Sequence, residues 1–505
     1  MKNTPNVKYI REELKKMTAM WRSIRIAILG AEAMRANAKD YVPHPDKTTA
    51  DTKEGAQRFK DYITRAVWYG ATASTVDGML GQIFARDPVY TGPKNTFDMV
   101  LEDVDGAGTS INQQARDACL DGLSLGRGGL FVDYTHISSG VGSTAEDVAR
   151  GESRPYIRYY RAEDIINWRE KWINGRKQTT LVVVHEEIDM EDDGYEVLRD
   201  HIWRELRLFN GVYYQCIWIE RGGELLQGPW VAPTKADGTT FDEIPFSIIG
   251  SMNNDFTVDP PPMRDIVEQN IAHFRNSADY EESCFICGQP TLFMSGMTEH
   301  WVKNVLDGAV TIGSRSAVPL PTGAVPVLLQ AQPNTMIKEA MDQKERLMVA
   351  LGAKLIDSDK TQRTLGEVSM EAYSQNSVLS RVSRNVSDAY TKALKWCADF
   401  MGVTEEVEYE LNTDFDVAKM SPEELTVLIS AWQSNAISFT EMRWQIKKGG
   451  RGYQDDEEMR AENELEDPLK LDITQIGKSD DDGNSDDDPN DPNKPPAEKD
   501  VGGDE

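Results

Sequence analysis

The middle of this 505-residue sequence changes character, and that change limits the folds that the chain can adopt. Between residues 155 and 250, short runs of β-branched and aromatic residues are separated by Gly, Asp and Asn, a pattern typical of strands joined by turns. The runs cover residues 156–160, 180–185, 203–209, 213–219 and 246–249. Helical periodicity dominates on both sides of this segment. The sequence therefore predicts an α+β fold that is mainly helical, with a strand-rich segment inside it.

The N-terminal side is predicted to form long amphipathic helices. Apolar residues recur in steps of three and four over residues 7–34 and again over residues 59–83, which indicates one helix in each stretch. A third helix is predicted over residues 111–123. Glycines and a short apolar run follow it, so residues 130–134 are predicted to form a strand.

The C-terminal half is predicted to return to helix. Helices are expected over residues 263–282, 336–351, 365–401 and 422–436, with strand-like runs at 291–294 and 309–312. Residues 313–333 are rich in Gly and Pro. Towards the C-terminus the chain becomes acidic and poor in large apolar side chains, so residues 466–505 are predicted to form a disordered acidic tail.

The composition excludes several classes of protein. Asp and Glu total 84 against 55 Lys and Arg, so the formal net charge is −29, and the chain is not of the basic type that grips nucleic acid through its phosphates. A protein that surrounds DNA without gripping it is not excluded. Five scattered cysteines are too few for a disulfide framework. No apolar run predicts a membrane span, and residues 1–5 lead into a charged helix rather than a secretory signal, so synthesis in a cytoplasm is expected.

The sequence lacks the motifs that most often carry catalysis. No glycine-rich loop with the spacing of a nucleotide phosphate-binding loop is present. Cys284 and Cys287 form a C-x-x-C pair, but no second pair stands at zinc-binding spacing. The glycines at 122, 126, 128 and 129 come between a predicted helix and a predicted strand, the reverse of a dinucleotide-binding motif, so they predict a tight turn. We therefore expect no enzymatic activity, no metal and no cofactor.

The tryptophans are predicted to lie in the core rather than on a binding surface. Trp21, Trp68, Trp168 and Trp396 fall on apolar faces of predicted helices or at strand ends. Large aromatic side chains at such positions are most often buried.

A series of short phrases carries a resemblance to a known family. The phrases are GQIFARDP (81–88), DGLSLGRGGLFVDY (121–134), RPY (154–156), IINWR (165–169), IPF (244–246), PPMRDI (261–266), HFRNSADY (273–280), QPTL (289–292) and AISFT (436–440). In this order, over about residues 5–465, they resemble a family of portal proteins of tailed bacteriophages that has long been classified as a domain of unknown function. An acidic stretch at residues 455–464 follows the last phrase, as in the C-terminal helical part of many portals.

The resemblance implies a portal fold. Portals are rings, usually of about twelve subunits, with a wing, a stem, a clip and a crown around an axial channel for double-stranded DNA. On this basis residues 1–150 are assigned to the helical part of the wing and residues 151–255 to a strand-rich wing or clip region. Residues 256–335 are assigned to a stem helix and a tunnel loop, the loop lying at 313–333. Residues 336–465 are assigned to a helical crown and residues 466–505 to the disordered tail.

The resemblance also implies a location and a set of partners. A portal sits at one vertex of the capsid in the virion, after assembly in the host cytoplasm. It is a conduit for DNA during packaging and ejection. Its implied partners are other copies of itself, the terminase large subunit, the major capsid or scaffolding protein, and head–tail adaptor or tail proteins; no membrane is involved.

The acidic balance is compatible with such a conduit. A ring of about twelve copies would carry about −350 formal charges, which would keep a duplex centred and unbound. Arg315 and Lys338, near the expected tunnel loop, are the candidates for brief contacts with the DNA backbone, without sequence reading.

Two alternatives stay open at this point. A minor capsid protein or head–tail adaptor would have the same composition. A nucleic-acid-processing enzyme, such as a terminase component, would require nucleotide-binding or metal-binding motifs, and the sequence does not show them.

Overall fold

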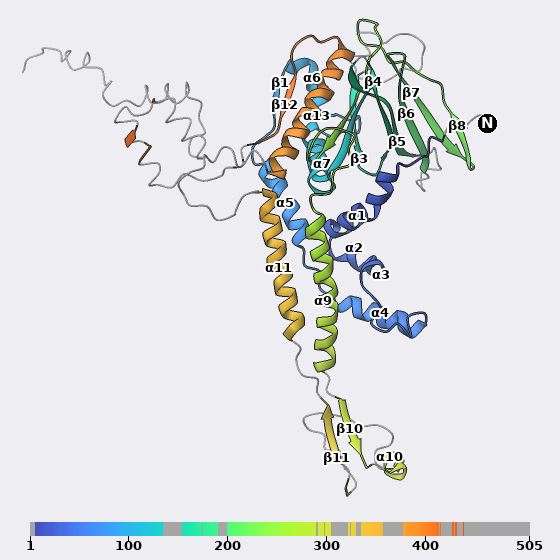
Figure 1. The fold of residues 1–505 in the computed structure, drawn as a ribbon, viewed down its shortest axis with the longest axis vertical. Helices are drawn as coiled ribbons and strands as arrows, with labels where there is room; N and C mark the ends of the chain where they lie inside the picture. The colour runs from blue at the N-terminus through green and yellow to red at the C-terminus, as the bar shows by residue number, and fades with distance from the viewer. Residues whose placement is uncertain are drawn as a thin grey trace, which may run out of the picture. The chain divides into compact units, whose positions relative to one another are not determined.

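The computed structural model describes most of the chain up to residue 415. The described residues are 6–134, 154–173, 175–189, 199–288, 291–296, 298–304, 322–323, 325–329, 335–356, 377–413, 415, 427–428, 430–431 and 438. The chain divides into two compact units, Met1–Asp416 and Val417–Glu505. The first unit contains the helices and sheets drawn in colour in Figure 1 and discussed below. The predicted acidic tail lies outside the described residues. Of the helix predicted over 422–436, only residues 427, 428, 430 and 431 are described, and these are helical.

The N-terminal helix is shorter than predicted. The structure has α1 (Glu12–Leu29), α2 (Ala31–Ala36) and α3 (Ala38–Tyr41) where one helix over residues 7–34 was expected, so that prediction is wrong. Gly30 has a φ of +90°, a conformation that glycine adopts readily and that no α-helix contains, and it separates α1 from α2. At the other end Arg11 is extended, and the residues before it lie against a sheet instead of continuing the helix.

The second predicted helix is also two helices. α4 (Lys53–Arg65) and α5 (Ala71–Ile83) are separated by a short connection that begins at Ala66, which is extended (φ −61°, ψ 136°). Thr52 caps α4, since its side chain accepts a hydrogen bond from the backbone N–H of Gly55. The apolar periodicity continued through the connection and therefore did not reveal the break.

The junction from helix to strand around the glycines is confirmed. After α6 (Lys94–Glu102) the chain forms α7 (Ile111–Ser124), whose N-terminus is capped by the Ser110 side chain. Gly126, with a φ of +77°, then turns the chain into β2 (Arg127–Tyr134). The third predicted helix and the strand at 130–134 are thus both present.

Two antiparallel sheets occupy the strand-rich segment. The three-stranded sheet has the order β3-β2-β9, with β3 (Pro155–Arg161) and β9 (Phe246–Gly250) on either side of β2. The five-stranded sheet runs β4-β5-β6-β7-β8 in chain order. Its strands are β4 (Ile165–Ile173), β5 (Arg176–Asp189), β6 (Arg199–Phe209), β7 (Val212–Arg221) and β8 (Glu224–Gln227). All five predicted runs are strands, whereas β4 and β8 were not predicted.

The tight turns of the five-stranded sheet follow from its turn residues. Between β6 and β7, Asn210 and Gly211 both have positive φ, 51° and 78°. Two such residues are typical of a two-residue hairpin turn, whose twist matches that of the strands.

The segment from residue 264 to residue 356 is a helix, a hairpin and a second helix. The helices are α9 (Arg264–Gly288) and α11 (Thr335–Ile356), which pack against each other. Between them come β10 (Thr291–Ser295), α10 (Glu299–Asn304) and β11 (Val325–Leu329), with β10 and β11 antiparallel. Residues 313–333 were expected to form a tunnel loop, but β11 lies inside this stretch, so that expectation is wrong for residues 325–329. The strand expected at 309–312 lies outside the described residues.

The last helix of the first unit crosses the core. α13 (Val378–Met401) accounts for the end of the helix predicted over 365–401; residues 365–376 lie outside the described part. β12 (Glu408–Glu410) follows and pairs antiparallel with β1 (Val89–Thr91). This pairing joins the C-terminal end of the described chain to its N-terminal third.

One large hydrophobic core joins the helices to both sheets. It includes residues from Leu14 in α1 to Leu411 after β12. The four tryptophans predicted to be in the core are all buried, which confirms that prediction. The three parts of the chain predicted as separate regions up to residue 335 therefore contribute to the same core.

Candidate functional site

The helix α9 covers most of the residues that were expected to form a stem helix, and it packs against α11. We call this pair of helices the stalk. The first half of α9 is buried against α1, α4 and α5. After Ala278, α9 has no buried residue in its described part, and α11 has none before Met348. Because the two helices are joined through the β10–β11 hairpin, these unburied stretches belong to the same half of the stalk. We call residues 279–286 and 335–347 the outer half.

The rest of the stalk, which we call the inner half, packs against the body of the chain through aromatic side chains. Phe274 in α9 is fully buried and meets Trp68 edge-to-face, with ring centroids 5.6 Å apart. Such pairs add to the stabilisation that comes from burial alone.

Ion pairs and a short hydrogen bond connect α9 to α4. The hydroxyl of Tyr62 donates to Oδ1 of Asp279 at 2.6 Å, and Arg65 pairs with Glu282. Arg58 lies 3.7 Å from the same Glu282 carboxylate. These contacts join residues more than 200 positions apart, and nothing in the sequence pattern predicted them.

A buried histidine links the two stalk helices. Nε2 of His273 in α9 lies 3.1 Å from Oε1 of Glu345 in α11. Burial lowers the pKa of His273 below its ordinary value, although the Glu345 carboxylate acts in the opposite direction. At neutral pH the link is therefore a neutral imidazole that donates its Nε2–H to a carboxylate.

Of the two residues predicted to contact DNA, the structure places one. Lys338 lies in the first turns of α11, in the outer half of the stalk, and its side chain is exposed. Arg315 lies outside the described residues, so the structure does not bring the two together. The outer half contains six acidic and three basic residues, so most of the charged residues around Lys338 in this part of the stalk are acidic. Cys284, from the C-x-x-C pair, is exposed on the last turns of α9.

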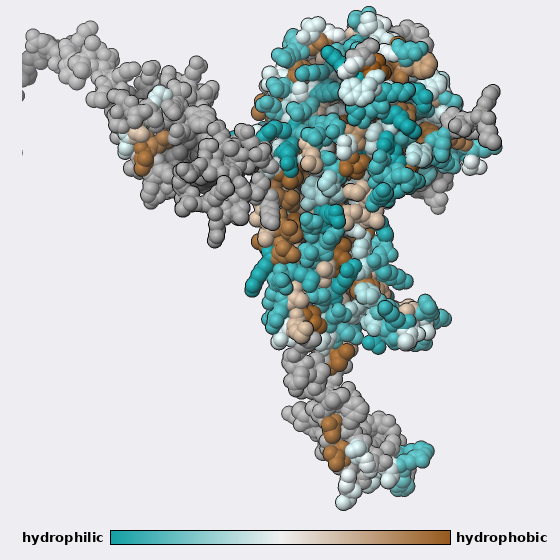
Figure 2. Space-filling view, in the orientation of Figure 1, coloured by the Kyte–Doolittle hydropathy of each residue, from teal (hydrophilic) through white to brown (hydrophobic). Residues whose placement is uncertain are grey.

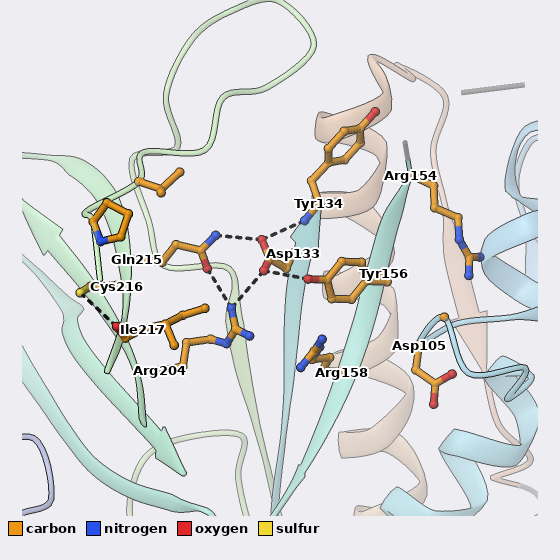
Figure 3. Close-up of a pocket in the computed structure, with 13 residues that line it drawn as sticks. Asp105, Asp133, Tyr134, Arg154, Tyr156, Arg158, Arg204, Gln215, Cys216 and Ile217 are labelled. Carbon is orange, nitrogen blue, oxygen red and sulfur yellow. Dashed lines mark hydrogen bonds and ion pairs between the residues drawn. The ribbon is translucent and has the colours of Figure 1, made fainter. Parts of the chain in front are cut away.

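A cluster of buried charges lies between the two sheets, beside a cavity of about 500 Å³ (Figure 3). Asp133, at the end of β2, accepts hydrogen bonds from three side chains. Tyr156 donates from β3 at 2.9 Å, Gln215 from β7 at 3.1 Å and Arg204 from β6 at 3.3 Å. The cluster therefore ties the three-stranded sheet to the five-stranded sheet.

A second carboxylate, that of Glu186, contacts Arg204 and a further cation. Nε of Arg204 donates to Glu186 at 2.7 Å, and Arg158 and Tyr160 donate to the same carboxylate at 2.9 and 2.7 Å. Burial alone would raise the pKa of Glu186, but Arg204 and Arg158 lower it below its ordinary value. Since these charges satisfy one another, we interpret the cluster as a cross-link between sheets rather than a ligand site.

The cluster was not predicted, although the sequence carries a signal for it. Along β6, Arg204 shares a face with Leu206 and Leu208, which are core residues. A charged residue in phase with core leucines indicates a buried ion pair. The partner residues, on other strands, could not be identified from spacing.

The described residues give no positive sign of a catalytic or metal centre. Among them, no group of three or more His, Cys, Asp or Glu side chains has the arrangement of a metal site. None of the described helices combines the length and the apolar character that crossing a lipid bilayer requires.

A carboxyl beside the cluster makes stability depend on pH. Burial, with a smaller contribution from Glu163, raises the pKa of Asp164 to about 6. An unfolded Asp titrates near pH 4, so the folded state holds this proton more tightly. The stabilising contribution is complete below about pH 4 and is lost as pH rises through 6.

We therefore expect Asp164→Asn to raise the free energy of unfolding at pH 8 by on the order of 1–3 kcal/mol relative to the parent chain. The difference should vanish near pH 4. Denaturant titrations at the two pH values measure this. Glu163→Gln is the control. Arg25 lowers the pKa of Glu163 despite the burial of that carboxyl, so removing the Glu163 charge should destabilise the fold at pH 8. An Asp164→Asn variant with equal effects at both pH values would contradict the assignment.

Comparisons with known proteins give a family match and likenesses to solved structures. A family model described as a domain of unknown function (DUF4055) matches residues 262–401, which include the stalk and α13. No curated protein matches the chain. In a structure of the neck of an empty GTA particle, a chain with 12% identical residues aligns over 80% of this chain and 95% of its own length, with a TM-score of 0.40.

The second likeness is to a chain in the virion of a native gene transfer agent (GTA) particle. It has 11% identical residues, covers 77% of this chain and 93% of the other, and has a TM-score of 0.38. Because both TM-scores are below 0.5, we base no functional conclusion on these likenesses.

Proposed function

We propose that this chain is a phage portal protein, one subunit of a ring at a capsid vertex through which double-stranded DNA is packaged and ejected. Two kinds of evidence support the proposal. The first is the resemblance of the ordered series of phrases to portal proteins. The second, which carries the argument from geometry, is the outer half of the stalk, where neither helix has a buried residue in its described part.

A pair of helices without buried residues lacks the packing that normally stabilises helices in proteins. Helices in proteins owe most of their stability to packing of an apolar face, and isolated helices are marginal in water. In the outer half Met336 has 74% of its surface exposed, and Phe285, Ile286 and Leu347 are also exposed. Figure 2 shows further hydrophobic residues at the surface where α11 lies beside α5, towards the other end of the stalk. Neighbouring stalks around a ring would cover such residues.

The portal proposal assigns roles to the elements as follows. The stalk is the stem, and the β10–β11 hairpin, which joins the far ends of its two helices, is the clip. This revises the expectation that the strand-rich segment supplies the clip and that residues 313–333 are the tunnel loop. The two sheets with α1–α7 are the wing. The crown was expected over residues 336–465; because α11 is now part of the stem, the crown is restricted to the chain after α13.

The same proposal leaves energy conversion to another chain. The sequence offers no phosphate-binding loop, so we propose that the portal is not an enzyme and that the terminase large subunit hydrolyses ATP. The acidic balance of the stalk would limit lasting contacts with phosphates. Capsid or scaffolding protein, and adaptor or tail proteins, are the other proposed partners. A head–tail adaptor is the alternative.

Native mass spectrometry of the purified chain tests the assembly. The proposal predicts one dominant species at about twelve times the 56.7 kDa subunit mass, without a ladder of smaller oligomers, because a ring closes. A monomer at every concentration would favour the adaptor.

The role of Lys338 is tested by charge reversal. We expect Lys338→Glu to lower the amount of DNA retained per particle several-fold, because a ring loses one phosphate contact in every subunit. Quantifying DNA in purified particles measures this. Lys303→Glu is the matched control, since Lys303 is also exposed but pairs within α10 with Glu299 at 2.7 Å. Equal DNA content in the two variants would remove Lys338 from the channel.

A further inference from the structure

The outer face of the five-stranded sheet carries a hydrophobic cluster of its own. Side chains alternate between the two faces of a strand. On the inner face they join the large core. On the outer face they form a separate cluster, which consists of Ile166, Val183, Trp203, Cys216 and Trp218, with Leu181 and Leu225 partly buried at its edge.

A short segment before α1 closes this cluster. Residues 6–11, which we call the strap, begin with a turn in which the N–H of Tyr9 donates to the carbonyl of Asn6 at 3.1 Å. Val7 stands in this turn, and only 5% of its surface is exposed. Among the described residues of the cluster, Val7 alone comes from outside the sheet. One aliphatic side chain from outside the sheet is thus buried in a cluster that contains two tryptophans.

Polar groups on both sides of Val7 fix the strap on the sheet. Lys8 pairs with Glu220 of β7, and its ammonium lies 4.7 Å from the centroid of the Trp203 ring. At the other end, the N–H of Arg11 donates to the carbonyl of Ile166 at 3.1 Å. The Arg11 guanidinium donates to the carbonyl of Trp168 at 2.9 Å and lies 4.2 Å over its ring.

Contacts within the sheet position the cluster residues of the sheet, and the strap takes no part in them. Nε1 of Trp218 donates to Glu205 at 2.9 Å, and Arg207 pairs with the same carboxylate. The thiol of Cys216 lies 3.3 Å from the carbonyl of Gly228. These contacts and the continuous β5–β6–β7 ladder are internal to the sheet and its connection.

We propose that the outer face of the five-stranded sheet is a preformed binding site for a short turn-forming segment in which a β-branched aliphatic residue precedes a lysine. The strap of the chain itself is the occupant. Because the site is independent of the strap, a strap supplied in trans binds to it, and straps can be exchanged between copies in an assembly. This inference does not depend on the portal proposal.

The test uses the chain lacking residues 1–11 and a fluorescent peptide of residues 1–11. We expect the shortened chain to fold, as judged by circular dichroism, and to bind the peptide with a dissociation constant below about 1 mM in fluorescence anisotropy. A peptide with Val7→Asp should bind at least about 10-fold more weakly, because a charge replaces the aliphatic side chain that the cluster buries. The full-length chain should show far weaker binding, since its own strap occupies the site.

A charge exchange separates specific docking from general adhesion. A Lys8→Glu peptide should lose affinity for the shortened chain and regain it on the Glu220→Lys variant of that chain. Failure of the shortened chain to fold, equal binding by the full-length chain, or absence of the rescue would each overturn the proposal. The first outcome would show that the strap is part of the sheet's own fold.

Discussion

Replacing Arg204 by Met should lower the free energy of unfolding by about 3–5 kcal/mol, the largest effect that we expect from a single polar side chain. Arg204 is the cation between Glu186 and Asp133, and the side chains of all three are at most 8% exposed. Without it, two carboxylates stay buried between the sheets, and only Glu186 keeps another cation, Arg158, within 2.9 Å. An uncompensated buried charge is far more costly than the loss of a surface ion pair.

Arg199→Met is the matched control. Arg199 lies on the same strand, its side chain is 59% exposed, and its partners Glu187 and Asp189 are exposed as well. We expect a change of about 1 kcal/mol or less. Denaturant unfolding at pH 7 and at pH 4 measures both variants. The deficit of Arg204→Met should shrink at pH 4, because protonation neutralises the two stranded carboxylates. A deficit below that of Arg199→Met, or one that grows in acid, would contradict the cross-link.

Truncation of Phe274 to Ala should cost about 3–5 kcal/mol as well, for a different reason. Phe274 is fully buried where α9 crosses the body of the chain, and its ring meets Trp68. Removing the ring leaves a cavity at the base of the stalk that the surrounding helices fill only in part. Thermal or denaturant unfolding of the isolated chain measures the loss.

Phe285→Ala on the same helix separates folding from assembly. Phe285 is 45% exposed in the outer half of the stalk and contacts the Arg65 guanidinium, 4.3 Å from its ring. We expect little change in the unfolding of the isolated chain, about 1 kcal/mol or less, and a clear loss of oligomer in native mass spectrometry. If Phe285→Ala destabilises the isolated chain as strongly as Phe274→Ala, the outer half is supported by the chain itself, and the argument for neighbouring stalks fails.

Elements with a strong local pattern could be predicted from the sequence. The helix over residues 111–123 has regular apolar spacing, and the strands at 203–209 and 213–219 have β-rich runs on either side of Asn210–Gly211. The break at Gly30 could not be predicted, because the apolar spacing passes through it unchanged. Val7 continued the helical spacing of α1, yet it packs on a sheet because the outer cluster offers it a buried position.

The stalk could be predicted only in part. Residues 263–282 were expected to form a stem helix, and α9 includes most of them. The pairing of α9 with α11, the His273–Glu345 contact and the ties from α4 all join residues distant in sequence, so no spacing could reveal them. The β10–β11 hairpin was not predicted, because the Gly and Pro residues around β11 indicated a loop.

Electron microscopy of the purified full-length chain tests the central claim most directly. The portal account predicts two-dimensional class averages of closed rings with an open axial passage wide enough for a DNA duplex. Single subunits only, or assemblies without an axial opening, at every concentration and also in the presence of the capsid and scaffolding proteins, would contradict it.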